Sequence, residues 1–277
     1  MIGFGVAFGG GGARGFAHIG VMRVLEREGL TPNVIAGTSM GALVGALFAA
    51  GLNADQVEVV VSQASLLKLL DLNPLADMLK FTELKKLLEP HLPERFEDLK
   101  IPFAATATDL IHGKQVYLQR GDLHHALRSS IAYPGAIAPV WVGDQLLSDG
   151  GILNQIPVDA ARFLGAMKVL AVDVTPLEPL EKQFQERSLE WWRRLLGREK
   201  EMGWMEVLYR AVEIMQSQIT DVRLSIFTPD MILHPKLEGI NLFAFNKVKE
   251  AIQAGEVAAE SQLEQLRKVF ETTGTEV

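Results

Sequence analysis

The chain has 277 residues, of which 48% are hydrophobic and 22% charged, and its formal net charge is −7 at neutral pH. This is the composition of a globular protein, and the negative charge argues against electrostatic binding of nucleic acid. The chain has no cysteine, which excludes disulfides, thiolate metal sites and cysteine nucleophiles.

Strand and helix signals alternate from the first residues onward. The segment "GFGVAF" (residues 3–8) predicts a buried strand, and the apolar face that follows the glycines predicts a helix ending at Gly29. A second short strand, "NVIAG" (33–37), leads directly into an apolar helix over residues 40–50. This alternation favours a parallel sheet flanked by helices.

Neither the N-terminus nor the apolar helix indicates export or a membrane span. The opening "MIGFGVAFGGG" lacks a basic segment and a cleavage site, so we expect no secretory signal. The longest apolar run, residues 40–52, is too short to cross a bilayer. We therefore expect a cytoplasmic protein.

The second half of the predicted sheet comes from four further segments. "IPFAATATDL" and "KQVYLQRG" predict strands, "APVWVGDQLLSDGG" predicts a hairpin that turns at Gly143–Asp144, and "KVLAVDV" predicts a buried strand. Beyond Thr175 the pattern is mostly helical, with "MILHPKL" as a late strand. The tail 246–270 predicts one amphipathic helix, or a pair broken near Gly255, with three candidate packing positions: Ala251, Val257 and Leu263.

We therefore predict one α/β domain over residues 1–277, built on a central, mostly parallel sheet flanked by helices. Residues 1–175 carry the motifs, and residues 176–277 form a mostly helical C-terminal portion.

The glycine run "GGGGARG" has two interpretations. Gly10 to Gly15 fits the G-x-G-x-x-G spacing of a dinucleotide-binding turn, which also expects an acidic residue at the end of the second strand. That strand instead ends in Thr38 and Ser39. The alternative is a nest of backbone N–H groups that stabilises a developing oxyanion.

The pentapeptide "GTSMG" places Ser39 between the second strand and the apolar helix. A serine nucleophile needs a sharp strand-to-helix turn that holds its oxygen clear of the backbone, and Gly37 and Gly41 permit such a turn. The helix also directs its N-terminal dipole towards the serine. A structural serine in a glycine-rich turn is the alternative.

The tetrapeptide "SDGG" supplies the best candidate for a base. Asp149 ends an apolar segment, and Gly150 and Gly151 let the backbone pass close to a neighbour. An aspartate that only stabilises a turn is the alternative interpretation.

"GGGGARG", "GTSMG" and "DGG", in this order, resemble the patatin-like phospholipase family, particularly its small bacterial members. The segments "IPFAATATDLIHGKQVYLQRGDL", "ALRSSIAYPGAIAPV" and "DGGILNQIPVDAAR" extend the resemblance over residues 3–174. The loop "PGAIAPV" lacks the bulky aromatic residue often found there, which leaves the pocket shape open.

The resemblance implies an α/β fold and hydrolysis of acyl esters in phospholipid or lysophospholipid, without cofactor or metal. It implies Ser39 as nucleophile and Asp149 as general base, with Gly10, Gly11 and Gly12 as the oxyanion hole. Gly15, Gly37, Gly41, Gly150 and Gly151 belong to the supporting motifs. Two other functions stay open: an esterase or thioesterase acting on acylglycerols or small esters, and a lipid-binding protein without catalysis.

Three other residues have alternative roles. His234 follows Asp149 in the chain and is the candidate base of a Ser-His-Asp triad. For His18 we favour a hydrogen bond that fixes the glycine loop over catalysis. For Arg14 we favour a buried pair that orients this loop over contact with a lipid phosphate.

The segment 187–210 holds three of the four tryptophans among residues of both charges. Indole side chains suit a lipid headgroup boundary, so Trp191 and Trp192 are candidates for peripheral membrane contact and the segment for a lid. A helix packed over the core is the alternative.

Overall fold

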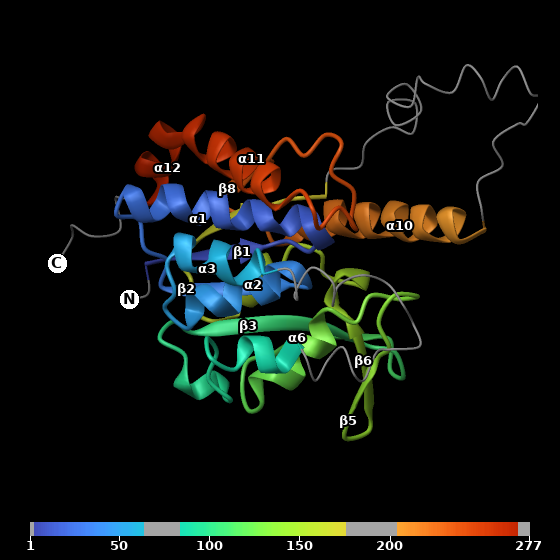
Figure 1. The fold of residues 1–277 in the computed structure, drawn as a ribbon. Helices are drawn as coiled ribbons and strands as arrows, with labels where there is room; N and C mark the ends of the chain where they lie inside the picture. Colours follow the sequence, from blue (N-terminus) through green and yellow to red (C-terminus); the bar gives the residue numbers. More distant parts are fainter. Residues whose placement is uncertain (1–2, 64–83, 176–203, 271–277) are drawn as a thin grey trace, which may run out of the picture.

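The structure is a computed structural model that describes residues 3–63, 84–175 and 204–270. Within these residues the strands form one eight-stranded sheet and alternate with helices along the chain (Figure 1). The strands are β1 (Phe4–Phe8), β2 (Val34–Thr38), β3 (Phe103–Asp109), β4 (Lys114–Leu118), β5 (Val140–Val142), β6 (Gln145–Asp149), β7 (Lys168–Val172) and β8 (Met231–Leu233).

The sheet is parallel at its centre and antiparallel at one side. Its order is β5-β6-β3-β2-β1-β7-β8, and the five strands from β3 to β8 run parallel. β4 and β6 both pair antiparallel with β3, and β5 pairs antiparallel with β6. β1, β2 and β3 are buried along their whole length, as expected for strands covered on both faces. The predicted fold class is confirmed.

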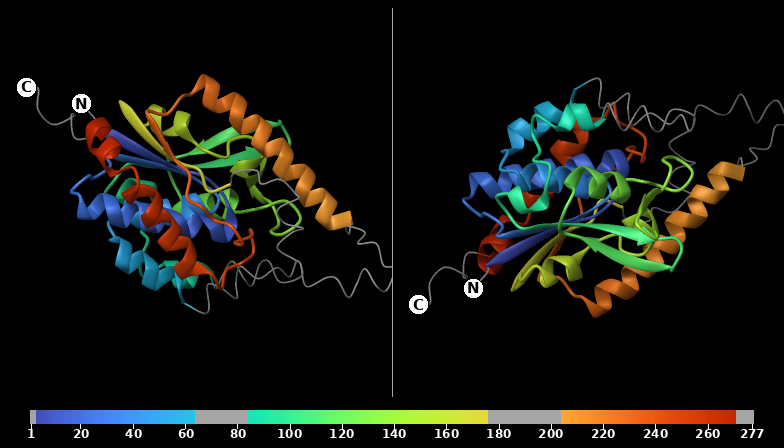
Figure 2. Two further views of the ribbon diagram at one scale, coloured as in Figure 1. Left: turned by 90° about the horizontal axis from the view of Figure 1, so that it is seen from above. Right: turned by 90° about the horizontal axis from the view of Figure 1, so that it is seen from below.

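Helices cover both faces of this sheet. Val6 and Phe8 of β1 belong to a large apolar cluster with α1, α2, α3 and α11, whereas Ala7 belongs to a smaller cluster with α7. Leu224 of α10 packs against the smaller cluster, and Figure 2 shows α10 and α11 on opposite sides of the sheet. The helices are α1 (Ala17–Arg27), α2 (Met40–Ala49), α3 (Ala54–Val61), α6 (Leu123–Ser130), α7 (Val158–Phe163), α10 (Trp204–Ile226), α11 (Val248–Glu260) and α12 (Leu263–Phe270), with short 3-10 turns η1 (Gly12–Phe16), η3 (Phe96–Asp98) and η4 (Gly150–Ile152).

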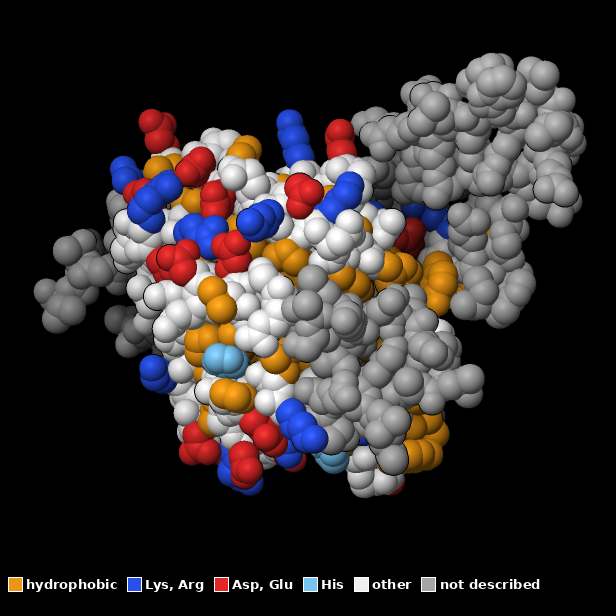
Figure 3. Space-filling model, in the orientation of Figure 1, with side chains coloured by type: hydrophobic (Ala, Val, Ile, Leu, Met, Phe, Trp, Pro, Cys, Tyr) orange, Lys and Arg blue, Asp and Glu red, His pale blue; other side chains and the backbone are white. Residues whose placement is uncertain are grey.

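Ion pairs on the outer surface of α1 join it to neighbouring helices. Arg23 pairs with Glu58 of α3 at 2.5 Å and with Glu256 of α11, and Arg27 pairs with Glu260 at 3.0 Å. Charged side chains gather over α1 and α11 on the face seen in Figure 3. This surface is therefore a solvated one.

The prediction for the C-terminal tail is wrong in two details. α11 runs through Gly255 without interruption. The helix ends at Glu260 instead, and α12 begins at Leu263. A Cβ at Gly255 would lie 1.9 Å from the carbonyl oxygen of Ala17, so this glycine allows α1 and α11 to approach closely. Val257 is 52% exposed and is not a packing position, whereas Ala251 is buried as predicted.

Candidate active site

Ser39 lies at a strained turn between β2 and α2. Its φ of 54° is the only positive φ of a non-glycine residue among the described residues, and its ψ is −124°. Its N–H donates to Oγ of Ser130 at 2.9 Å, and its carbonyl accepts from the N–H groups of Ala42 and Leu43. The start of α2 and Ser130 thus hold a backbone conformation that costs free energy. This is the predicted strand–turn–helix setting of a nucleophile.

The two glycines of "GTSMG" are needed for close packing. A Cβ at Gly37 would lie 2.4 Å from the carbonyl oxygen of Gly41, and a Cβ at Gly41 would lie 2.5 Å from that of Phe8. Gly15 has the same role against α2, because its Cβ would lie 2.6 Å from Cγ of Met40. The turn can therefore sit directly on the end of β1 only with glycine at these positions.

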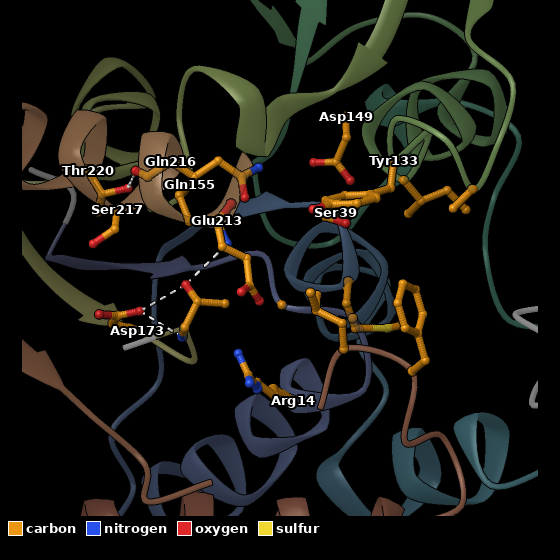
Figure 4. A pocket seen from close by; sticks show the side chains of 18 of the residues that line it. Arg14, Ser39, Tyr133, Asp149, Gln155, Asp173, Glu213, Gln216, Ser217 and Thr220 are labelled. Carbon is orange, nitrogen blue, oxygen red and sulfur yellow. Dashed lines mark hydrogen bonds between the residues drawn. The ribbon is translucent and has the colours of Figure 1, made fainter. Parts of the chain in front are cut away.

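Asp149 is buried at the end of β6, with 1% of its surface exposed. Its Oδ1 accepts the N–H of Gly151 at 2.7 Å, while Oδ2 has no hydrogen-bond partner within the described part of the chain. Burial raises the pKa of Asp149 from 3.8 to about 6, and the nearby Ser39 hydroxyl and the Gly151 N–H oppose this rise. Figure 4 shows the carboxylate directed towards Ser39. The two side chains face each other, but no hydrogen bond of normal geometry joins them.

Strand register brings Ser39 and Asp149 together. Thr38, which precedes Ser39, pairs with Thr106 of β3, and the next residue of β3, Ala107, pairs with Asp149. The Thr38 and Thr106 hydroxyls share a hydrogen bond of 2.7 Å. A Cβ at Gly150 would lie 2.2 Å from Oγ1 of Thr106, so a glycine is required where the chain leaves Asp149. β3 therefore fixes both residues at the same edge of the sheet.

The glycine loop leaves β1 at this same edge. The Gly10 N–H donates to the carbonyl of Gln155 at 3.0 Å, and the Gln155 amide donates back to the Gly10 carbonyl at 2.9 Å. The amides of Gly11 and Gly12 make no hydrogen bond within the described residues, and both glycines line the pocket. Their N–H groups are thus available to a bound group, whereas the Gly10 N–H is engaged.

His18 supports this loop from α1. Its Nε2 lies 2.7 Å from the carbonyl oxygen of Gly9 and must donate to it. Burial lowers the pKa of His18 from 6.5 to about 4, so the ring is neutral at pH 7. The hydrogen bond that we predicted for His18 is confirmed.

Ser39, Asp149 and the glycine loop at Gly11 line a cavity of about 370 Å³ that has two different ends. Near Ser39 the walls are apolar and come from α2, the loop after α6 and the loop before α11: Met40, Leu43, Ile131, Tyr133, Ile137, Leu242, Phe243 and Phe245. Away from Ser39 the walls are polar, and Figure 4 shows Asp173, Ser217 and Thr220 there. The cavity therefore suits an amphipathic molecule.

Arg14 reaches into the cavity from the opposite side to Asp149 (Figure 4). Its Nε donates to the carbonyl of Ile240 at 2.7 Å. Among the described residues no carboxylate lies within ion-pair distance of it. The buried ion pair that we favoured for Arg14 is therefore not found there, and a backbone carbonyl orients the side chain instead.

His234 also lines the cavity, but its partner is Asp173. Nδ1 of His234 lies 3.3 Å from Oδ2 of Asp173, and this contact raises the pKa of His234. Within the described part of the chain no hydrogen bond or ion pair joins a histidine to Ser39 or Asp149. The triad alternative thus has no geometric support.

Several residues of the site escaped the sequence analysis. Gln155 pairs with the Gly10 backbone, Ser130 holds the Ser39 amide, and Tyr133 lies beside Asp149 (Figure 4). Burial and the charge of Asp149 raise the pKa of Tyr133 above its ordinary value. Gln155 and Ser130 lie in the segments that carry the family resemblance. Their place in these segments is the only feature of the sequence that could have marked them as part of the site.

The predicted membrane contacts at Trp191 and Trp192 lie outside the described residues, as does most of the segment 187–210. Among the described helices, none has the length and apolar character that a bilayer span requires. The described residues contain no cluster of three or more His, Asp or Glu that could hold a metal ion.

A serine on a strained strand-to-helix turn, facing a buried aspartate at one edge of a parallel sheet, defines an α/β protein with a hydrolase-type serine site. The family profile for patatin-like phospholipases matches residues 6–162. The chain belongs to this family, as the sequence motifs predicted.

Relatives agree with this assignment. The chain is 40% identical over 199 residues to an uncharacterized NTE family protein of Mycobacterium tuberculosis, an alignment that covers 69% of this chain and 55% of that protein. It is 30% identical over 268 residues to patatin-like phospholipase domain-containing protein 7 of Rattus norvegicus, covering 90% of this chain and 20% of the relative. The chain thus spans about half the length of the first protein and a fifth of the second.

Among solved structures, VipD from Legionella pneumophila aligns with a TM-score of 0.58 at 13% identity, covering 96% of this chain and 67% of VipD. At this identity the likeness shows a shared fold.

Proposed function

We propose that the chain is a lipid acyl hydrolase that uses Ser39 and Asp149 as a catalytic dyad. The Ser39 oxygen attacks the ester carbonyl while Asp149 accepts the Ser39 proton. The N–H groups of Gly11 and Gly12 donate to the oxyanion that forms. The Gly10 N–H, which we also expected in the oxyanion hole, is engaged by Gln155, so the proposal rests on the other two donors.

The observation that carries the proposal is the buried Asp149 beside the strained Ser39. An aspartate with an ordinary pKa near 4 is a weak base for a serine proton, and a pKa of about 6 improves the match. At neutral pH the carboxylate is still mostly ionised and can accept the proton. Collapse of the tetrahedral intermediate breaks the bond to the alcohol part of the ester, and Asp149 gives its proton to the leaving oxygen. The regenerated carboxylate then takes a proton from water, which attacks the acyl-serine ester and releases the fatty acid and Ser39.

We propose phospholipid or lysophospholipid as the substrate. The apolar end of the cavity beside Ser39 fits an acyl chain, and the polar end fits glycerol and a head group. Arg14 offers an N–H fork to a phosphate, because only its Nε is used by the Ile240 carbonyl. One of the relatives is named for a patatin-like phospholipase domain, which supports the same substrate class.

Active-site labelling tests the dyad directly. Wild type and the Ser39→Ala, Asp149→Asn and Ser217→Ala variants are exposed to a fluorophosphonate and weighed intact. We expect one adduct in wild type and in Ser217→Ala, which changes another serine of the same cavity. We expect none in Ser39→Ala and strongly slowed labelling in Asp149→Asn.

Other outcomes would reassign the chemistry. Labelling of Asp149→Asn at the wild-type rate would exclude Asp149 as the base, and no labelling of folded wild type would favour a lipid-binding protein without catalysis. A panel of lysophospholipid, diacyl phospholipid, triacylglycerol, acyl thioester and a short soluble ester, followed by release of free acid, then separates the substrate classes.

A further inference from the structure

Helix α10 is amphipathic in the reverse of the usual sense. Four of its polar side chains face inward and line the cavity (Figure 4): Glu213, Gln216, Ser217 and Thr220. The positions directed outward are mostly apolar, and we call them the outer face of α10: Val207, Leu208, Ala211, Ile214, Met215, Gln218, Val222, Ser225 and Ile226. A helix on a solvated surface normally has the opposite arrangement.

The outer face is long, exposed and nearly free of charge. Met215 is 56% exposed, Val222 60% and Ile226 67%. From Val207 to Ile226 the residues recur at helical spacing over a length of roughly 30 Å. Asp221, at the margin with the cavity, is the one charged residue among the exposed positions of this described segment. The outer surface of α1, with its arginine–glutamate pairs, shows the contrast (Figure 3).

The fold prevents α10 from turning this face inward. Near its C-terminal end Arg223 forms an ion pair with the buried Asp159 and donates to Oδ1 of Asn154 at 3.2 Å. Near its N-terminal end the Tyr209 ring stacks on Tyr133, with 6.1 Å between the ring centroids. Rotation of the helix would break both contacts. Both views in Figure 2 place α10 along one edge of the molecule.

We propose that the outer face of α10 docks on a lipid surface whose head groups carry no net charge. The inference rests on the proposed function, since a lipid hydrolase must meet its substrate in a lipid surface. α10 then separates that surface from the cavity by the thickness of one helix. Apolar residues at such a boundary are the general signature of interfacial helices.

Charge decides between possible occupants of this face. Interfacial helices that bind anionic lipids carry Lys and Arg, and the exposed positions from Val207 to Ile226 have neither. The formal net charge of −7 disfavours contact with an anionic membrane or with a second copy of the chain, because both are negatively charged. A zwitterionic surface has no net charge and does not repel the chain.

The test is flotation with vesicles of diether phosphatidylcholine, which is zwitterionic and has no acyl ester to cleave. We compare wild type with Met215→Glu, Val222→Glu and the double variant, none of which changes a residue of the cavity. Val257→Glu on α11 is the matched control, because Val257 is 52% exposed on another helix. Thermal unfolding and hydrolysis of a short soluble ester report on the fold and the site.

We expect wild type and Val257→Glu to float, and the vesicle partition coefficient to fall about tenfold for each glutamate on α10. Flotation of the double variant at the wild-type level would overturn the proposal, as would wild type that hydrolyses the soluble ester but does not float. If wild type is a dimer, and Met215→Glu makes it monomeric without changing flotation, the outer face of α10 would instead be the contact with a second copy of the chain. Flotation needs no catalysis, so wild type that floats without hydrolysing any ester would refute the proposed function alone.

Discussion

Replacement of Asp149 by asparagine should make the protein more stable while abolishing activity. The side chain is buried, and one of its carboxylate oxygens has no hydrogen-bond partner among the described residues. Asparagine has the same shape, keeps an oxygen that can accept the Gly151 N–H, and carries no charge to desolvate. The stability cost of the buried carboxylate should therefore disappear in the variant.

The size of the effect follows from the pKa of Asp149. The pKa is about 6 in the folded protein and 3.8 without the protein environment, a difference equivalent to about 3 kcal/mol. Because the folded-state pKa is the higher one, the carboxylate destabilises the folded protein fully above pH 6. This penalty shrinks as the pH falls and is absent below pH 3.8. Asp149→Asn should gain up to about 3 kcal/mol at pH 7 and much less near pH 4.

Urea unfolding of wild type and Asp149→Asn at pH 7 and near pH 4.5 measures this difference. Asp159→Asn is the contrasting control. Asp159 is equally buried but accepts hydrogen bonds from Asn154 at 2.8 Å and Tyr117 at 2.5 Å and pairs with Arg223. Its replacement should destabilise the protein at pH 7, by at most about 3 kcal/mol because Arg223 is partly exposed. A loss of stability in Asp149→Asn at pH 7, or a gain that does not change with pH, would refute the reasoning.

Further predictions concern the pH profile, two glycines and the arginine. The kcat/KM of wild type for a soluble ester should fall as the pH drops through about 6, because Asp149 must be ionised; an apparent pKa near 4 in a pH–rate profile would contradict this. Gly41→Ala should lower stability by about 3 kcal/mol in thermal unfolding and slow fluorophosphonate labelling, since its Cβ would lie 2.5 Å from the Phe8 carbonyl. Gly255→Ala should destabilise the protein by separating α1 and α11, yet leave labelling unchanged below the melting temperature. Arg14→Gln should reduce kcat/KM for a phospholipid about tenfold more than for a neutral soluble ester. Equal losses of kcat/KM for the two substrates would contradict a contact between Arg14 and the phosphate.

Local patterns were sufficient to predict the fold class and both proposed catalytic residues. The strand–turn–helix setting of Ser39 could be predicted because its sequence signal lies within one short segment, from β2 to α2. The turn at Gly143–Asp144 was found for the same reason, and it joins β5 to β6 as predicted. The division of residues 1–277 into a core and a helical portion stays a prediction, although α10 supplies one wall of the cavity.

The residues missed by the sequence analysis are those whose partners lie far away along the chain. The Ser130 hydroxyl is polar on a helix, and no local pattern states that it will accept the Ser39 N–H. Gly255 was misinterpreted because glycine weakens an isolated helix, whereas in the folded protein it makes room for Ala17. His234 was a candidate base by chain order alone, and strand β8 places it beside Asp173 instead.

The long-range contacts of the site also determine when it can exist during synthesis. The hydroxyl of Thr38, next to Ser39, donates to the carbonyl of Asn154, 116 residues away, and the Gly10 carbonyl accepts from Gln155, 145 residues away. The serine leaves the ribosome long before the aspartate that faces it and before the helix that forms the cavity wall. A nascent or truncated chain that ends before β6 therefore carries Ser39 without Asp149, so the proposed dyad can form only after synthesis has passed β6.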